Sequence, residues 1–175
     1  MRYRVLLLAL SLIVPACGGG QGGGEATATT GSVTTFADPG IQTFPDEGRT
    51  QVPAGTDIQY DTDPPTSGLH YPDPQPGGFY TDPVAAGSLV SSMENGGVII
   101  YYDAAPLTAP DLDSLRLLAE AHPGDSSQVV VVPRTDPLHP IILTAWTHML
   151  PLDGFDQGRI DNFIALFLGK GPENS

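Results

Sequence analysis

The chain has 175 residues, 40% of them hydrophobic, and its 21 glycines and 18 prolines gather mainly before position 90. Its formal net charge is −13, and loss of a leader that holds Arg2 and Arg4 would leave five basic and twenty acidic residues. Such a surface repels phosphate backbones, which argues against nucleic acid as a partner. The single cysteine, Cys17, excludes an intramolecular disulfide, a Cys-rich zinc site and a CxxC redox pair.

Residues 1–16, MRYRVLLLALSLIVPA, have a short basic start followed by an apolar run and small residues. This layout is typical of a signal peptide, and the apolar run is too short to span a membrane in the mature protein. The residues before Cys17 resemble a lipobox, in which the cysteine thiol is joined to diacylglycerol and the leader is removed. We therefore expect a lipoprotein that is secreted across the cytoplasmic membrane and anchored to the cell envelope. A plain signal peptide with an incidental cysteine is the alternative.

Residues 17–40 are rich in Gly and Thr and nearly free of large apolar side chains, so they are expected to form a flexible tether. Residues 41–175 then form a single globular domain. Its first part, from Ile41 to Gly87, has turn signals in quick succession and predicts loops with short strands, for example at Asp57–Tyr60.

The second half has clearer elements. The segments VIIYY (98–102), VVVV (129–132) and IILTAW (141–146) are apolar runs typical of buried strands. Thr108 and Asp111 resemble a capping box before an amphipathic helix that ends at residues 122–124, and apolar residues at helical spacing predict a second helix around 160–167. The order β-α-β-β-α predicts a two-layer α+β fold: a small mixed sheet, two amphipathic helices, and a loop-rich N-terminal half wrapped over it.

Five segments, in this order and spacing, carry a resemblance to a known family: FPDEGRTQVPAGT, DTDPPTSGLHYP, LVSSMENGGVIIYY, PIILTAW and GKGPE. The chain resembles the bacterial domain-of-unknown-function family 3105 over nearly all of residues 44–173. The resemblance implies an extracytoplasmic, often tethered domain of no established activity. It also implies that relatives have histidines at four positions. In this chain these positions are occupied by Gln51, His70, Ser91 and Asn95, so only one histidine is kept.

Histidines in that arrangement, with an acidic residue, would suit copper or zinc in relatives. In this chain His70 lies in a turn from which its ring could reach Glu94. A weakened metal site would use these two residues with His148 or Met93. The alternative for His70 is structural, as a ring that bonds a backbone carbonyl and fixes the loop.

Our leading interpretation is a non-enzymatic, membrane-anchored domain that binds a small ligand or an envelope protein through a loop-rich face. That face would present His70, Tyr71, Tyr80, Glu94 and Asn95. The alternatives are a metal-binding protein with the degenerate histidine site and, less favoured, a small hydrolase. The sequence has serines, histidines and aspartates but no G-x-S-x-G elbow, so it names no catalytic residue.

Overall fold

The computed structural model of the protein describes residues 36–124, 128–136 and 138–174. The expected signal peptide, Cys17 and nearly all of the expected tether lie outside the described residues. The described residues belong to one compact unit. None of their helices is both long and apolar enough to cross a lipid bilayer.

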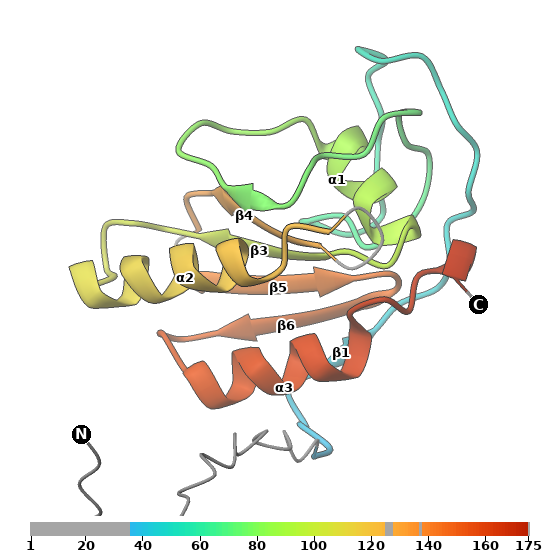
Figure 1. Ribbon diagram of the computed structural model, residues 1–175. Helices are drawn as coiled ribbons and strands as arrows, with labels where there is room; N and C mark the ends of the chain where they lie inside the picture. Colours follow the sequence, from blue (N-terminus) through green and yellow to red (C-terminus); the bar gives the residue numbers. More distant parts are fainter. Residues whose placement is uncertain (1–35, 125–127, 137, 175) are drawn as a thin grey trace, which may run out of the picture. The chain divides into compact units, whose positions relative to one another are not determined.

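A mixed sheet of six strands forms the centre of this unit, in the spatial order β1-β6-β5-β3-β4-β2 (Figure 1). The pair β3–β4 and the pair β2–β4 are parallel, and the other neighbours are antiparallel. The strands are β1 (Gln42–Thr43), β2 (Gly78–Phe79), β3 (Val98–Tyr102), β4 (Val129–Pro133), β5 (Ile141–Ala145) and β6 (His148–Leu152).

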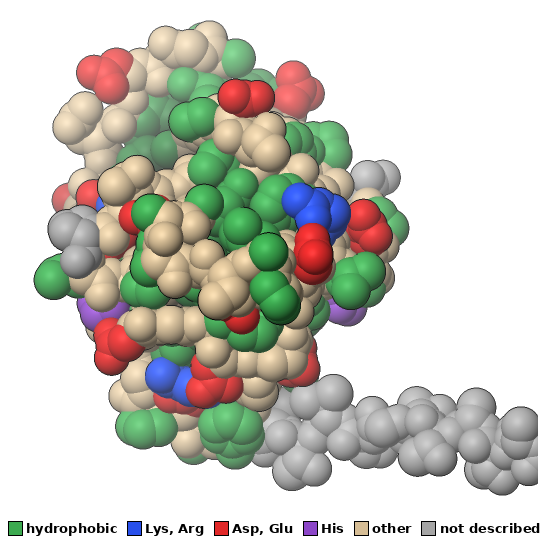
Figure 2. All heavy atoms as spheres, turned by 90° about the vertical axis from the view of Figure 1, so that its left-hand side faces the viewer, with side chains coloured by type: hydrophobic (Ala, Val, Ile, Leu, Met, Phe, Trp, Pro, Cys, Tyr) green, Lys and Arg blue, Asp and Glu red, His purple; other side chains and the backbone are tan. Residues whose placement is uncertain are grey.

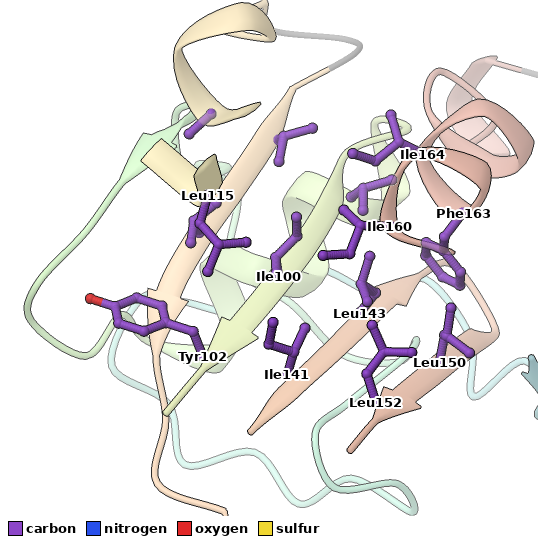
Figure 3. Close-up of a cluster of buried hydrophobic side chains, with 14 of the residues drawn as sticks. Ile100, Tyr102, Leu115, Ile141, Leu143, Leu150, Leu152, Ile160, Phe163 and Ile164 are labelled. Atoms are coloured by element: carbon purple, nitrogen blue, oxygen red, sulfur yellow. The ribbon is translucent and has the colours of Figure 1, made fainter. Parts of the chain in front are cut away.

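Two helices cover one face of the sheet, α2 (Ala109–Ala121) and α3 (Gln157–Phe167) (Figure 1). Ile160, Phe163 and Ile164 of α3 point toward strand residues such as Leu143 in the main core (Figure 3). Alternate residues of each strand face this core, because successive side chains of a strand point to opposite faces. The α+β arrangement of a small mixed sheet with amphipathic helices is therefore confirmed.

The opposite face is covered by α1 (Ala86–Glu94) and by the loops of the N-terminal half. Leu89, Val90 and Met93 of α1 pack on Ile99 and Tyr101 of β3 in a second apolar cluster. The loop-rich half thus wraps over the sheet, as the turn signals predicted.

The predicted strands at 98–102, 129–132 and 141–146 match β3, β4 and β5 within one residue. The predicted capping box is also present, with Asp111 N–H donating to Thr108 Oγ1 and Thr108 N–H to the Asp111 carboxylate. Three elements differ. Helix α1 and strand β6 add to the predicted order, and Asp57–Tyr60 has no strand.

Phe36 and Asp38, inside the range expected to be tether, pack against α3. Phe36 exchanges two hydrogen bonds with Asn162 of α3, and Asp38 accepts two from Arg159 at 2.7 and 2.9 Å. The chain therefore enters the domain along α3. On the surface shown in Figure 2, acidic side chains are scattered, and the basic side chains in view lie against acidic ones.

Candidate functional site

His70 is completely buried and is held on three sides. Its backbone pairs with Gln51 in an isolated bridge, and its N–H donates to the Thr50 carbonyl. In the ring, Nδ1 lies 3.0 Å from the Gly68 carbonyl oxygen and Nε2 lies 2.8 Å from Oε2 of Glu94. The contact with Glu94 that the sequence suggested is therefore present.

The surroundings of the His70 ring fix where its hydrogens are. A carbonyl oxygen only accepts, so Nδ1 carries a hydrogen and donates it to Gly68. A bare Nε2 and a bare carboxylate oxygen 2.8 Å apart would repel each other, so a further proton lies on Nε2 or on Glu94. The contact between Nε2 of His70 and Oε2 of Glu94 is too bent to be a well-formed hydrogen bond. The pair is therefore a buried imidazole and a buried carboxyl in close polar contact.

Glu94 is the last residue of α1 and is 5% exposed. Burial raises the pKa of its carboxyl above the ordinary value, while the neighbouring charges of His70 and Arg49 act in the opposite direction. The C-terminal segment closes tightly over this end of the helix, because a Cβ at Gly171 would collide with the Glu94 carbonyl.

The positions at which the resemblance implies histidines lie around this pair. Gln51 is bridged to His70, and Ser91 and Asn95 lie on or just after the last turn of α1. Asn95 Nδ2 donates to the Ser91 carbonyl at 3.0 Å. These positions carry no further imidazole in this chain.

The other two suggested metal ligands do not complete a site. Met93 is fully buried in the apolar cluster between α1 and the sheet. His148 lies on β6, where Nδ1 donates to the Trp146 carbonyl at 2.8 Å and the ring packs on Phe167. Residues 36–124, 128–136 and 138–174 contain no group of three or more His, Cys, Asp or Glu that could hold a metal ion. Within these residues, His70 and Glu94 thus meet without a third His, Cys, Asp or Glu placed to share an ion with them.

The remaining residues of the expected binding face use their polar atoms inside the fold. Tyr71 hydroxyl donates to the Thr56 carbonyl at 2.9 Å, and Tyr80 hydroxyl donates to the Pro76 carbonyl at 2.8 Å. His70 and Glu94 are buried, and the two tyrosine hydroxyls bond to loop carbonyls. These polar groups therefore connect loops within the fold.

The hydrolase alternative requires a serine beside a histidine. Within the part of the chain that the structure describes, no serine hydroxyl is hydrogen-bonded to a histidine ring. The hydroxyl nearest to one is that of Thr147, 3.2 Å from Nδ1 of His148, and that nitrogen already donates to a carbonyl. This geometry does not activate a nucleophile.

A pocket that the sequence did not predict lies between the loop 58–65, the segment 83–84 with the start of α1, and the ends of β3 and β4. Its volume is about 480 Å³, within the roughly 300–1,000 Å³ of small-molecule sites. We call it the apolar pocket. It is lined by Ile58, Tyr60, Thr62, Asp63, Pro64, Pro65, Pro83, Val84, Ala86, Leu89, Tyr101, Val132, Pro133 and Arg134.

Among these lining residues, Asp63 and Arg134 carry opposite charges and form an ion pair with each other. Arg134 donates to both carboxylate oxygens of Asp63, at 3.0 and 2.9 Å. This hydrogen bonding raises the pKa of Arg134, and the Asp136 carboxylate lies 3.9 Å from the same guanidinium. The pocket therefore presents a neutral, mostly apolar wall.

Tyr101 lines the pocket from the sheet. Its hydroxyl is sealed from solvent and makes no well-formed hydrogen bond within the described residues, although Thr144 lies nearby, and burial raises its pKa far above the ordinary value. Tyr60 closes another side, with its hydroxyl donating to the Leu69 carbonyl and its pKa raised by burial to about 12. Both phenols therefore stay uncharged at neutral pH.

The sequence carried only an indirect signal for this pocket. Four of its lining residues are prolines. In a sequence, prolines indicate turns and do not indicate the wall of a pocket. The Asp63–Arg134 pair joins residues 71 positions apart, beyond the reach of any local pattern.

Comparison with known proteins gives one match. The model of the family described as "Protein of unknown function (DUF3105)" matches residues 51–175, which include the His70 segment, α1 and the whole sheet except β1. No curated protein matches the chain. No solved structure matches it either. The chain therefore belongs to the DUF3105 family, as the order and spacing of five segments in its sequence indicated.

Proposed function

We propose that this protein is an envelope lipoprotein whose globular domain binds an uncharged, largely apolar small molecule in the apolar pocket, without catalysing a reaction on it. The observation that carries the proposal is the lining of that pocket. Apolar side chains and proline rings line most of this pocket, whose volume is about 480 Å³.

The electrostatics of the lining favour a neutral ligand. A charged ligand would have to compete with the two-point contact between Arg134 and Asp63, which occupies both terminal nitrogens of the guanidinium and both carboxylate oxygens. A neutral molecule leaves that contact intact and gains roughly 25 cal/mol for each Å² of apolar surface that it buries. The ligand is therefore selected by shape and apolar character.

The anchoring part of the proposal rests on residues 1–17. A lipid on Cys17 would hold the pocket close to the envelope membrane, where apolar molecules concentrate. The membrane is then the first partner of the protein, and its small ligand is the second.

A fragment of residues 36–175 tests the pocket apart from the anchor, because the described residues form one compact unit. The neutral fluorescent probe N-phenyl-1-naphthylamine should bind with one-to-one stoichiometry. Ala86→Phe, at the first residue of α1 and in the pocket wall, should fill the space and abolish binding. Ala109→Phe is the matched control, since Ala109 is the exposed first residue of α2 outside the pocket.

Loss of probe binding in Ala86→Phe with retention in Ala109→Phe would support the proposal. Equal binding by both variants would place the probe elsewhere on the protein. Absence of saturable binding in the unsubstituted fragment would contradict the pocket as an apolar site. Labelling of cells with a radioactive fatty acid, with and without Cys17→Ser, tests the anchor separately.

A further inference from the structure

The five basic residues in the described part of the chain fall into two groups. Three form ion pairs: Arg116 with Asp113, Arg134 with Asp63, and Arg159 with Asp38. Arg49 and Lys170 have no carboxylate within 4.0 Å among the described residues. Arg49 acts on the buried Glu94 carboxyl only through a longer-range charge interaction.

Arg49 and Lys170 line the same hollow, although they are 121 positions apart in the sequence. The hollow has a volume of about 700 Å³, and we call it the Trp146 hollow. Three segments of the chain form it: the loop 44–49, the β5–β6 turn, and the segment after α3. Its lining is Phe44, Asp46, Arg49, Trp146, Thr147, His148, Lys170 and Pro172.

This hollow is distinct from the apolar pocket. The two sites share no lining residue. Tyr101, in the apolar pocket, pairs with Ile142 near the start of β5, whereas the Trp146 hollow includes the turn after the end of that strand. They therefore lie at opposite ends of the central strands.

The ring systems of the Trp146 hollow are held in place. Trp146 Nε1 donates to Oδ2 of Asp46 at 3.2 Å, which fixes the indole. Thr147 has a φ of 61°, a conformation that a β-branched residue rarely adopts. Phe44 N–H donates to the Thr147 carbonyl and Thr147 N–H donates to the Thr66 carbonyl, both at 2.9 Å, and these two bonds hold it there. Strain of this kind is concentrated at functional sites.

The polar groups of the hollow offer three kinds of contact. Arg49 and Lys170 can both bind an acid group. The Asp46 carboxylate accepts from Gly48 N–H and from Trp146, and it has further lone pairs for hydroxyl donors. Nδ1 of His148 donates to a carbonyl, so Nε2 remains for a ligand.

We propose that the Trp146 hollow binds a sugar acid, with its carboxylate on Arg49 and Lys170, its hydroxyls on Asp46, and its ring against Trp146. An anion without hydroxyls has no donor for the Asp46 carboxylate and could not form a hydrogen bond with it. A neutral sugar would leave both cations unused. The overall negative charge of the protein opposes a long-range approach, but at about 0.15 M salt this repulsion is screened over roughly 8 Å, whereas contacts inside the hollow are shorter.

Trp146 is the only tryptophan of the chain, so its fluorescence reports on this hollow directly. Titration of residues 36–175 with glucuronate should give a saturable change of the Trp146 emission. Glucose, which lacks only the acid group, and benzoate, which lacks the hydroxyls, should each bind at least tenfold more weakly. A trimer of galacturonate added in a parallel titration distinguishes a free sugar acid from the end of an acidic polysaccharide as the source of the ligand.

Arg49→Gln and Lys170→Gln should each weaken glucuronate binding by about tenfold to a hundredfold, the usual effect of losing one charge-assisted hydrogen bond. Arg116→Gln removes the same charge from an exposed ion pair elsewhere and should leave the dissociation constant unchanged. Equal affinity for glucose and glucuronate would overturn the proposal. So would equal loss in Arg116→Gln, or no saturable change at millimolar glucuronate. None of these results bears on probe binding in the apolar pocket, so the two proposals fail separately.

Discussion

The imidazole Nε2 of His70 lies 2.8 Å from Oε2 of Glu94, and both side chains are buried. His70 belongs to the loop-rich half and Glu94 ends α1, so the pair fastens the loops to the helix beneath them. A buried pair of this kind is costly to break, because the partner that remains has lost its solvation and gained nothing in return. The pair therefore connects the stability of this region to pH.

Glu94→Gln should change how stability depends on pH. Burial raises the folded-state pKa of Glu94 above its ordinary value of 4.5, so the folded chain holds this proton more tightly than the unfolded chain. The stabilisation is complete below pH 4.5 and is lost as the pH rises through the folded-state pKa. Glutamine resembles the protonated acid, so the wild type should lose stability relative to the variant as the pH rises above 4.5.

Urea unfolding at unit steps from pH 4 to pH 7 measures this difference. Glu120→Gln is the control, because Glu120 is exposed on α2. Its curve should run parallel to that of the wild type. A parallel curve for Glu94→Gln as well would show that Glu94 titrates alike in the folded and unfolded chains.

Two adjacent tyrosines on β3 should respond oppositely to removal of the hydroxyl. The buried Tyr101 hydroxyl makes no well-formed hydrogen bond within the described residues, so Tyr101→Phe should leave the free energy of unfolding unchanged or raise it by up to about 1 kcal/mol. Tyr102 hydroxyl donates to the Tyr80 carbonyl at 3.0 Å, so Tyr102→Phe should lower it by about 1 kcal/mol. Equilibrium unfolding in urea compares them directly. A loss in Tyr101→Phe as large as that in Tyr102→Phe would mean that its hydroxyl has a partner in solution.

The parts of the fold that the sequence predicted are those with strong local patterns. Strands β3, β4 and β5 are continuous apolar runs, and parallel or central strands that are covered on both faces require such runs. Helix α2 begins at a capping box whose two residues are three positions apart. Patterns of this length can be seen without knowing what lies across the sheet.

The elements that were missed have weak local patterns. Helix α1 has nine residues, with one glycine and three serines, and no side chain caps its start. Strand β6 contains Pro151, which is tolerated because β1 pairs only with His148 and Met149 and leaves the outer side of β6 open beyond them. The sequence pointed to the contact between His70 and Glu94, but both pockets join segments far apart along the chain, which no local pattern reveals.

The ion pair of Asp38 with Arg159 should stabilise the domain measurably. Two hydrogen bonds of 2.7 and 2.9 Å join the groups, and the Asp38 side chain is almost fully buried. Asp38→Asn should lower the free energy of unfolding by about 1–2 kcal/mol at pH 7. Bonding to Arg159 lowers the pKa of Asp38, so the difference from wild type should disappear as the pH falls below 3.8.

The exposed pair of Asp113 and Arg116 is the comparison for that measurement. A single hydrogen bond of 2.7 Å joins it, and both side chains are largely open to solvent. Asp113→Asn should change stability by less than about 0.5 kcal/mol. Equal losses in the two variants would mean that burial adds nothing to the Asp38 contact.

Gly171 should be the glycine least able to accept a side chain. A Cβ at this position would overlap the Glu94 carbonyl and the Gly96 nitrogen, which are backbone atoms that cannot rotate away. Gly171→Ala should therefore lower the free energy of unfolding by about 1–3 kcal/mol, the usual cost of overpacking. Gly154→Ala is the matched control, since no atom lies within 4 Å of its Cβ position. Thermal unfolding of both should show a clear fall in Tm for Gly171→Ala alone, and an unchanged Tm would mean that the C-terminal segment does not press on the end of α1 in solution.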